Sequence, residues 1–487
     1  MTSHFDGCVM YGLDKNTKML FVSCPLFHWH LLHTTFQFAA TGSPTTDLNY
    51  IEATMTPAQY IQAKKDSYTW SHIAGFVSGQ LKDSHSKLAK ADVIQKYTKE
   101  KGRPMIRCHR EPERLLKSRV CKAGYFMLMN SGLDHLGINN TRLMLYSDRW
   151  KHRESLGATA QTLELLDDMS GFYTCLDRAG VLQRAKYVCD KYKLRHRRGR
   201  HWITVARRGC SPPKFGKSSY SDDYVSVHVD EIYEVLVWAS GFSCFKLGVH
   251  FLRQILGLFQ GCALSVILAL FTAAADEDRW LCSLGADRQL VFGFRWFDDR
   301  FLWFIYTMFS TTSRSKATRL RKDSSQIYMD GIECEPEDPP NFLESALTER
   351  PDGTLLLMHN NKNWSSICTH GCQSIITQLP RSSFHPDSIL DGYRISRIKS
   401  VIMHANTDFG MIAAALQQIT EWTTCLGDDV DDVIRMLRCL CHNTTRSTRG
   451  IWKTVLDITT RCNEATVPSG EHLDDPEGSE CSATICD

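Results

Sequence analysis

The chain has 487 residues, 43% of them hydrophobic and 10% aromatic, with 57 Lys and Arg against 54 Asp and Glu. This composition excludes an intrinsically disordered chain, and the length allows roughly two to four domains. The 19 cysteines are too diluted for a disulfide scaffold, and the polar start Met1–Gly12 lacks the apolar segment of a signal peptide. We therefore expect reduced thiols and an intracellular protein.

Charge is distributed unevenly along the chain. Seven acids and no Lys or Arg lie between Asn463 and Asp487, so the remainder holds 57 basic and 47 acidic residues, a net charge of +10. A basic body with an acidic tail is the asymmetry expected of a protein that binds a polyanion such as nucleic acid.

The N-terminal part of the sequence carries the weakest signals. An apolar run, Met19–Phe38, precedes helical patterns at Pro57–Lys64 and His72–Leu88. The basic segment Lys96–Lys122 then predicts a strand entering an Arg103-Pro104 step, with a helix after Glu111-Pro112.

A pair of acids follows the next apolar run. Leu163, Leu165 and Leu166 alternate along a predicted strand that ends at Asp167-Asp168, and Ser170-Gly171 and the aromatic pair Phe172-Tyr173 come next. A predicted helix over residues 178–193 ends in the basic cluster Lys193–Arg200. For that cluster a nuclear-import signal, a phosphate-binding patch and a solvated face are alternatives.

The segment Leu256–Ala275 contains no charged residue and is long enough to span a bilayer. Composition alone allows either a membrane helix or a buried helix here. The stretch Gln254-Ile-Leu-Gly257-Leu-Phe-Gln260-Gly261-Cys-Ala-Leu-Ser265 leads into this apolar segment and overlaps its start. Glycines before a helix let a backbone or nucleotide approach closely, and a helix N-terminus favours phosphate.

Two adjacent acids, Asp298-Asp299, lie between the aromatic runs of Phe294–Phe304. This pattern predicts a β-hairpin with the acids at its tip. Carboxylates beside so much apolar surface cost several kcal/mol unless they are paired or bind metal, and Mg²⁺ favours carboxylate and phosphate oxygens. An ordinary solvated turn is the alternative.

Phosphoryl transfer from a nucleotide needs two metal ions held by carboxylates from separate strands. Asp298-Asp299 would supply the metal-binding carboxylates of one strand pair, and Asp167 or Asp168 would supply the carboxylate of a neighbouring strand. A large aromatic residue about five positions after the metal-binding Asp would lie under the sugar and exclude a 2′-hydroxyl. Tyr173 lies five positions after Asp168, and Phe172 lies five positions after Asp167. Spacing therefore leaves both assignments open. The order of acid, Gly-rich helix start and Asp-Asp hairpin favours this chemistry over a membrane helix.

This order of motifs resembles that of reverse transcriptases, most closely those of Penelope-like retroelements, which are relatives of telomerase. The resemblance covers residues 96–420 and favours the register of Asp168 and Tyr173. It rests on Arg103-Pro104-Met105, Asp168–Thr174, Gln254 with Gly257, Gly261 and Ser265, Phe297-Asp298-Asp299, Phe342-Leu343-Glu344, Lys362, and Ser383-Phe-His385-Pro386 with Gly392 and Arg394.

The resemblance implies an α+β right-hand polymerase with fingers, a palm built on an antiparallel sheet, and a helical thumb. We expect an N-terminal extension over residues 1–90, fingers and palm over 91–380, the thumb over 381–446 and an acidic, disordered tail over 447–487. The implied activity is that of a retrotransposon RNA-directed DNA polymerase, a nucleotidyltransferase that uses an RNA template, a DNA primer and dNTPs. The same resemblance, with the basic cluster, implies a nuclear location and no membrane association.

The resemblance also assigns roles to individual residues. Asp168, Asp298 and Asp299 would be catalytic and hold two Mg²⁺ ions, for which Mn²⁺ could substitute. Substrate would be bound by Lys101, Arg103, Tyr173, Gln260, Gly261 and Ser265. Nucleic acid would be bound by Lys362, Arg394 and Arg397. A catalytically decayed or domesticated element protein that binds nucleic acid, and an RNA-dependent RNA polymerase, are the alternatives.

Overall fold

The structure is a computed structural model, and it consists of two compact units. Met1–Leu356 and Ile375–Thr377 form the first unit, and Leu357–Ser374 and Gln378–Asp487 form the second. The residues that the structure describes are 8–13, 16–39, 48–74, 88–95, 102–136, 157, 159–209, 211–217, 223–329, 331–336, 341–342, 345–349, 355–359, 368–370, 381, 386–404, 423, 426–443, 453 and 457.

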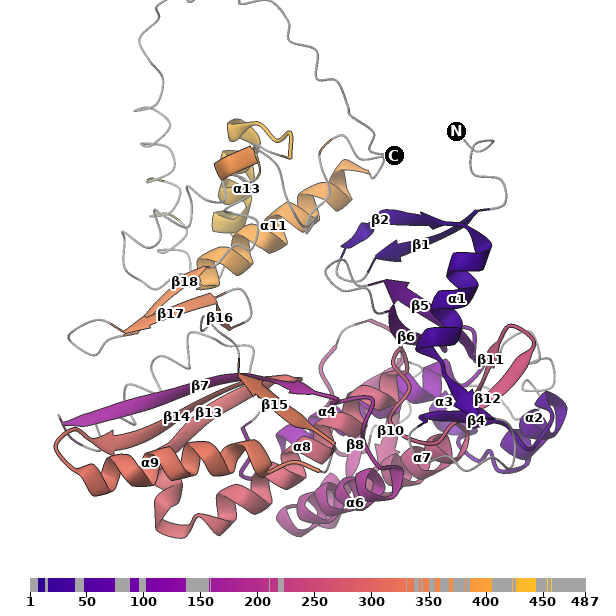
Figure 1. Cartoon of the computed structure of the whole chain (residues 1–487), viewed down its shortest axis with the longest axis horizontal. Coiled ribbons are helices and arrows are strands. Elements are labelled where there is room, and N and C mark those ends of the chain that lie inside the picture. Colours follow the sequence, from indigo (N-terminus) through magenta and orange to yellow (C-terminus); the bar gives the residue numbers. More distant parts are fainter. Residues whose placement is uncertain are drawn as a thin grey trace, which may run out of the picture. The chain divides into compact units, whose positions relative to one another are not determined.

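The first unit contains a four-stranded antiparallel sheet with the order β13-β14-β7-β15. Its strands are β7 (Ala160–Ser170), β13 (Val291–Trp296), β14 (Asp299–Thr307) and β15 (Glu333–Pro336). The helix α9 (Thr311–Asp323), capped by the Ser310 hydroxyl, runs along one face of this sheet (Figure 1). The predicted hairpin is therefore present, and the predicted strand before Asp167-Asp168 is its neighbour.

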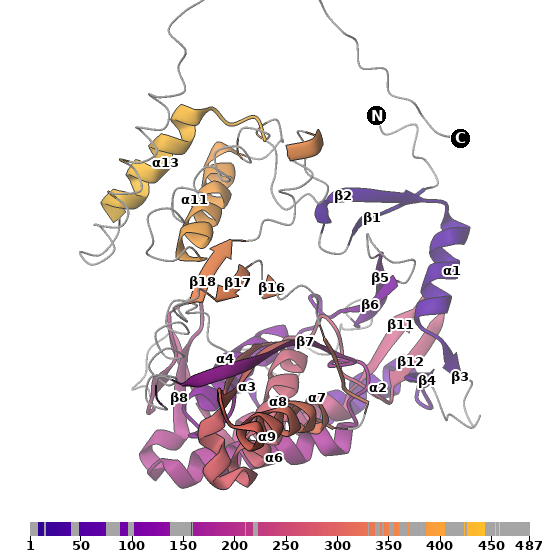
Figure 2. The ribbon, with the colours of Figure 1, turned by 60° about the vertical axis from the view of Figure 1, so that its left-hand side comes forward.

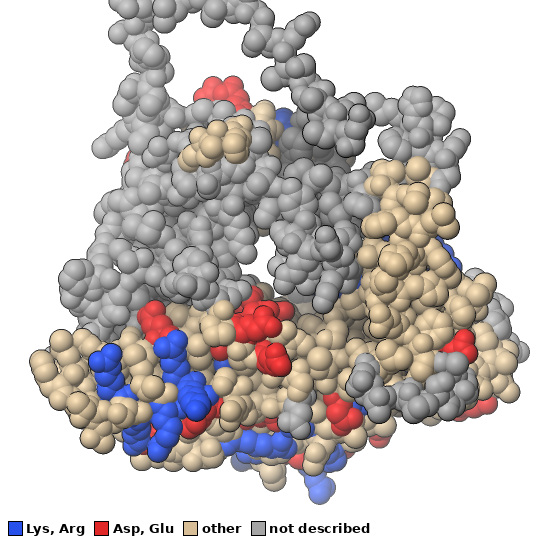
Figure 3. All heavy atoms as spheres, viewed as in Figure 1, with Lys and Arg blue, Asp and Glu red and all other residues tan. Residues whose placement is uncertain are grey.

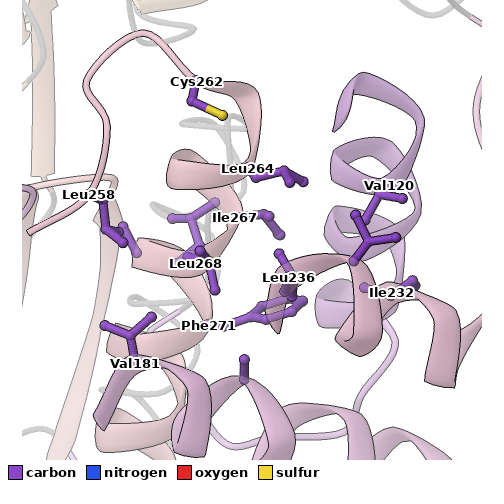
Figure 4. Packing of buried hydrophobic residues seen from close by; sticks show 14 of the residues in the cluster. Val120, Val181, Ile232, Leu236, Leu258, Cys262, Leu264, Ile267, Leu268 and Phe271 are labelled. Atoms are coloured by element: carbon purple, nitrogen blue, oxygen red, sulfur yellow. The ribbon is translucent and has the colours of Figure 1, made fainter. Parts of the chain in front are cut away.

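A helical layer supports this sheet. It consists of α4 (Arg114–Met129), α6 (Arg178–Arg195), α7 (Val229–Gly241) and α8 (Ala263–Ser283). Apolar side chains from all four helices meet in one core (Figure 4). The 21-residue helix α8 is buried along most of its length because it packs between α4 and α6.

The apolar segment that allowed a membrane helix consists of the non-helical residues 256–262 and the first part of α8, from Ala263 to Ala275. None of the helices in the described ranges is long and apolar enough to cross a membrane. The last third of α8 buries three acids, and each has a basic or polar partner: Asp276 with Arg184, Glu277 with Arg295, and Asp278 with Tyr187.

A six-stranded sheet with the order β3-β4-β12-β11-β5-β6 forms the second part of this unit. Its strands are β3 (Phe38–Ala39), β4 (Tyr50–Glu52), β5 (Lys90–Gln95), β6 (Gly102–Arg107), β11 (Cys244–Leu247) and β12 (His250–Gln254). Because β4 pairs with β12, the first 90 residues contribute strands to the same sheet as later segments. The boundary that we expected at residue 90 therefore lies inside a compact unit.

The remaining elements of the N-terminal region are short. They are the paired strands β1 (Val9–Leu13) and β2 (Asn16–Ser23), and the helices α1 (Pro25–Thr35), α2 (Pro57–Asp66) and α3 (Ser71–Ala74). The helix expected at Pro57–Lys64 is α2, which begins with a capping box between Thr56 and Gln59. Of the helix expected over His72–Leu88, the described residues contain only α3.

A third sheet, β10-β8-β9, lies beside α4 (Figure 2). It is formed by β8 (Trp202–Ala206), β9 (Lys214–Phe215) and β10 (Tyr224–His228), and the 3₁₀ helix η4 (Arg198–His201) precedes it.

The C-terminal part of the chain begins with the small sheet β16-β17-β18 and continues with helices. The strands are β16 (Asn341–Phe342), β17 (Ser345–Glu349) and β18 (Leu355–His359), and the long helices of the second unit are α11 (Asp387–His404) and α13 (Val430–Asn443). Both long helices lie within residues 381–446, where the resemblance implies helical structure.

Candidate active site

A cavity of about 520 Å³ opens in the first unit where four segments meet. These are β6, the loop after β7, the N-terminal end of α8, and the tip of the β13–β14 hairpin. Seven of the predicted site residues line it: Arg103, Asp168, Tyr173, Gln260, Gly261, Ser265 and Asp298. Lys101 and Lys362, and the side chain of Arg397, lie outside the described parts of the structure.

The acids gather at one end of the four-stranded sheet. Phe297 and Asp298 form the two-residue turn, so Asp299 is the first residue of the returning strand β14. Asp299 lies directly opposite Asp168 of β7, and directly opposed residues of antiparallel strands project from the same face. The Met169 amide donates a 2.9 Å hydrogen bond to the Asp298 carbonyl, which fixes the turn against β7.

Asp167, the alternative metal ligand, lies on the opposite face of the sheet. Its carboxylate receives two hydrogen bonds from the Arg300 guanidinium, Nε to Oδ1 at 2.7 Å and Nη2 to Oδ2 at 2.5 Å. Both side chains are at most 2% exposed. Strand alternation therefore separates the neighbouring acids: Asp167 is held in a buried ion pair, and Asp168 lines the cavity.

A second buried arginine supports the turn from below. Arg295 lies opposite Arg300 in the hairpin, and its Nε donates to Glu277 Oε1 at 2.6 Å. Arg295 Nη1 also donates to the Phe297 carbonyl at 3.0 Å. This bond matters because Phe297 has φ +55°, a left-handed conformation that costs a non-glycine residue about 1–3 kcal/mol and needs external support. The structural role of these arginines was not predicted, although two charged residues placed symmetrically in apolar strands are a signal for buried ion pairs.

The two aromatic residues after the β7 acids occupy different surroundings. Both residues line the cavity, but Phe172 is buried in the core, whereas Tyr173 is partly exposed. Burial, together with the negative charge of Asp298, raises the pKa of Tyr173 to about 12, so its hydroxyl stays protonated at neutral pH. The structure thus brings Asp168 together with Tyr173, the register that the resemblance favours.

Gly257 fixes the backbone beneath Tyr173. The Leu258 amide donates to the Tyr173 carbonyl at 2.8 Å, and the Gly257 amide donates to the Leu176 carbonyl at 2.9 Å. A Cβ added at Gly257 would lie only 2.8 Å from the Tyr173 carbonyl oxygen. Only glycine permits this approach.

Gly261 provides the corresponding contact to β6. The Ile106 amide donates to the Gln260 carbonyl at 2.8 Å, and a Cβ at Gly261, where φ is +108°, would lie 2.7 Å from the Ile106 carbonyl oxygen. This contact makes Arg103-Pro104-Met105 a wall of the cavity. Gln260 Oε1 is buried and has no hydrogen-bond partner among the described residues, so the cavity contains an acceptor able to receive a donor from a ligand.

A thiol pair that the sequence analysis missed lies beside this contact. Cys262, the N-cap of α8, lines the cavity, and Cys108 follows β6. A hydrogen bond from Cys108, with the nearby ammonium of Lys117, lowers the pKa of Cys262 to about 6 despite burial. The same interaction and burial raise the pKa of Cys108.

The donor chemistry of the site fits Mg²⁺. Asp168 and Asp298 line one cavity and Asp299 is in register with Asp168, so three carboxylates are available at one end of the sheet. Mg²⁺ usually takes one or two carboxylates and completes its shell with substrate phosphates and water. Within the described ranges, no group of three or more His, Cys, Asp or Glu side chains is assembled as a ready-made metal site.

The expected role of Arg394 is not compatible with its surroundings. Its guanidinium in α11 is fully buried and paired with the fully buried carboxylate of Asp428, which precedes α13. A buried, paired guanidinium cannot follow the backbone of a duplex, so Arg394 has a structural role inside the second unit.

The chain was compared with known proteins and solved structures. No family model matches the chain, and no curated protein matches its sequence. A telomerase from Candida albicans, in complex with a TWJ fragment of telomeric RNA, matches at a TM-score of 0.51 and 11% identity, over 95% of this chain and 72% of that one. Apo telomerase from Candida tropicalis matches at 0.47 and 12%, over 93% and 69%. The RNA-dependent RNA polymerase of bacteriophage phi12 matches at 0.42 and 8%, over 81% and 64%.

The first of these matches, together with the antiparallel sheet and its helices, confirms the α+β right-hand polymerase fold that the sequence predicts. At such low identity the likeness concerns the fold alone.

Proposed function

We propose that this chain is an RNA-directed DNA polymerase, a reverse transcriptase of the Penelope-like retroelement kind. It would extend the 3′-hydroxyl of a DNA primer with dNTPs on an RNA template. One observation carries the proposal: Asp168 and Asp298 line a single cavity together with Tyr173 and the Gln260-Gly261 pair. Acids, a large aromatic side chain and a glycine-bounded helix start are the parts that template-directed nucleotide addition requires.

In the proposed reaction the primer hydroxyl attacks the α-phosphate of the dNTP and pyrophosphate leaves. Asp168, Asp298 and Asp299 would hold two Mg²⁺ ions, which activate the hydroxyl and stabilise the developing negative charge. The protein's own share is to fix these carboxylates, through the β7–β14 register and the buried arginines behind them.

The cavity walls would position the nucleotide. Arg103 would donate charge-assisted hydrogen bonds to the triphosphate, and Lys101, outside the described residues, belongs to the same proposal. Gln260, Gly261 and Ser265 would contact the incoming nucleotide and its template base, since the free Gln260 Oε1 acceptor is buried at the cavity.

Primer extension tests this proposal directly. The purified chain is incubated with an annealed RNA template and DNA primer, dNTPs and Mg²⁺ or Mn²⁺, beside an Asp298→Ala/Asp299→Ala variant. We expect extension by the wild type and its loss in the variant. A wild type that binds the annealed strands but does not extend them with either metal would instead support the decayed, binding-only alternative.

Replacing Tyr173 tests the sugar gate. We expect Tyr173→Ala to raise incorporation of NTPs relative to dNTPs by about 10- to 200-fold, because the ring that excludes the 2′-hydroxyl is removed. Tyr173→Phe keeps the ring and is the matched control. Single-nucleotide incorporation assays with dNTP and NTP pairs give the ratio. Unchanged discrimination in the alanine variant would contradict the gate, and a wild type that prefers NTPs would favour the RNA polymerase alternative.

A further inference from the structure

The three-stranded sheet β10-β8-β9 has one buried and one partly exposed face. Ile203, Val205 and Val227 are fully buried on the first face. At the edge of that face Phe215 of β9, opposite Ile203, contacts Phe126 of α4 but remains 39% exposed. The residues that alternate with them therefore project from the other face.

That second face carries aromatic rings and lysines. Trp202 lies opposite His228, and their ring centroids are 4.9 Å apart. The Lys217 ammonium lies 4.7 Å from the Trp202 ring, and that of Lys214 lies 6.0 Å from the ring of Tyr224. The three rings are partly exposed and both lysines are exposed. We call Trp202, Lys214, Lys217, Tyr224 and His228 the aromatic sheet face.

The chain from residue 195 to residue 217 is strongly basic, whereas Asp222-Asp223 precede Tyr224 and Asp230-Glu231 follow His228. Between residues 195 and 217 the sequence contains eight Lys and Arg and no Asp or Glu. Those cations are Arg195, Arg197, Arg198, Arg200, Arg207, Arg208, Lys214 and Lys217. None of the eight forms an ion pair with a described carboxylate. Asp230, beside His228, is paired with Lys193 at 2.7 Å.

We propose that the aromatic sheet face and its surrounding cations form a binding site for single-stranded nucleic acid. Aromatic rings on a sheet stack unpaired bases, and Lys and Arg around them attract the phosphates. A duplex would hide its base faces from the rings, and an acidic protein surface or a lipid headgroup would leave the rings without a function. None of these residues lines the candidate active site, so the inference is independent of the polymerase proposal.

Binding to short single strands tests the site. The full chain is titrated into fluorescent 15-nucleotide RNA and DNA oligonucleotides of one sequence, with anisotropy measured at several salt concentrations. For Lys214→Gln/Lys217→Gln we expect roughly tenfold weaker binding at low salt. We also expect the slope of log affinity against log salt to fall by about 1.4, since each lost contact to a single strand removes about 0.7.

A matched control removes two charges elsewhere. Figure 3 shows Lys and Arg gathered over α9, where Arg319 and Lys322 are exposed. Arg319→Gln/Lys322→Gln changes the net charge equally and should leave affinity and slope near the wild-type values. Equal losses in both variants, or no loss in the first, would overturn the proposal. The RNA and DNA arms tell which strand the site prefers.

Crosslinking places the bound strand on the protein. Oligonucleotides carrying 4-thiouridine or 4-thiothymidine are irradiated with the Asp298→Ala/Asp299→Ala chain, and crosslinked peptides are identified by mass spectrometry. We expect crosslinks in the peptides of Trp202 and Tyr224, lost in Trp202→Leu. Crosslinks confined to residues of the candidate active site would overturn the proposal. Because this protein is catalytically disabled, failure of the polymerase proposal would not affect the readout.

Discussion

Asp167 and Asp168 are adjacent in sequence but experience opposite environments. The strand directs Asp167 into a buried pair with Arg300, whereas Asp168 lines the cavity beside Asp298. Removing one partner of a buried ion pair costs about 3–5 kcal/mol, because the other charge is left without compensation. Asp168 is only partly buried at the open cavity, so its removal does not leave a fully buried charge without compensation. Stability and activity should therefore respond to these two residues in opposite ways.

We expect Asp167→Ala to lower the free energy of unfolding by about 3–5 kcal/mol, and Asp168→Ala to leave it nearly unchanged while abolishing primer extension. Urea denaturation and extension assays measure the two effects. Asp168→Asn is the control variant, because it keeps the size of the side chain and removes only its negative charge. Equal stability losses in Asp167→Ala and Asp168→Ala would contradict the assignment of the two faces.

Cys262 offers a pH-dependent test of the thiol pair. Its pKa is lowered to about 6 by the hydrogen bond from Cys108, so the reactive thiolate predominates above pH 6 and is lost as the pH falls through that value. We expect iodoacetamide to label Cys262 at pH 7 several-fold faster than at pH 5.

Cys108→Val removes the hydrogen-bond donor and keeps the apolar volume. The midpoint of the Cys262 labelling profile should then rise, since the interaction that favours the thiolate is gone. Peptide mass spectrometry across pH 5 to 9 gives the profile. A midpoint near 9 in the wild type would show that the pair is not coupled as described.

At the scale of elements, the cavity depends on two glycines that bring separate backbones together. Gly257 allows the segment before α8 to contact the loop after β7, and Gly261 allows the same segment to contact β6. The segment before α8 therefore joins two elements. Because the glycines are four residues apart, Gly257 can contact the loop after β7 while Gly261 contacts β6.

We expect Gly261→Ala to reduce stability by about 1–3 kcal/mol and to raise the KM for dNTPs, because the added methyl group forces β6 away from α8 and opens the wall at Arg103. Gly241→Ala at the end of α7 is the control, since a Cβ there meets nothing within 4 Å. Thermal unfolding and steady-state extension kinetics check both effects. A Gly261→Ala enzyme with wild-type KM would show that the junction does not shape the cavity.

At the scale of the whole molecule, the features predicted correctly are those written in short stretches of sequence. The Asp298-Asp299 hairpin, the strand before Asp168 and the helix after Gly261 each follow from a local pattern of apolar, acidic and glycine residues. Their meeting in one cavity followed from the order of motifs and the fold that this order resembles.

The features that the sequence did not predict depend on partners far along the chain. The buried state of Arg394 requires Asp428, and that of Asp167 requires Arg300, 133 residues away. The first 90 residues appeared separate because no local pattern shows that Tyr50–Glu52 pairs with His250–Gln254. A local pattern can indicate that a charge is buried, but it does not show which distant residue pairs with that charge.

The paired arginines of the hairpin have a further consequence for how the chain chooses its fold. Arg295 and Arg300 face each other across β13 and β14, on the side opposite Asp299. A slip of β14 by one residue against its neighbours would turn every one of its side chains over, burying Asp299 and exposing Arg300. Such a mispaired strand would carry an uncompensated buried charge, which disfavours it relative to the native register. The two buried arginines thus favour the one strand alignment that keeps the three carboxylates in their observed positions.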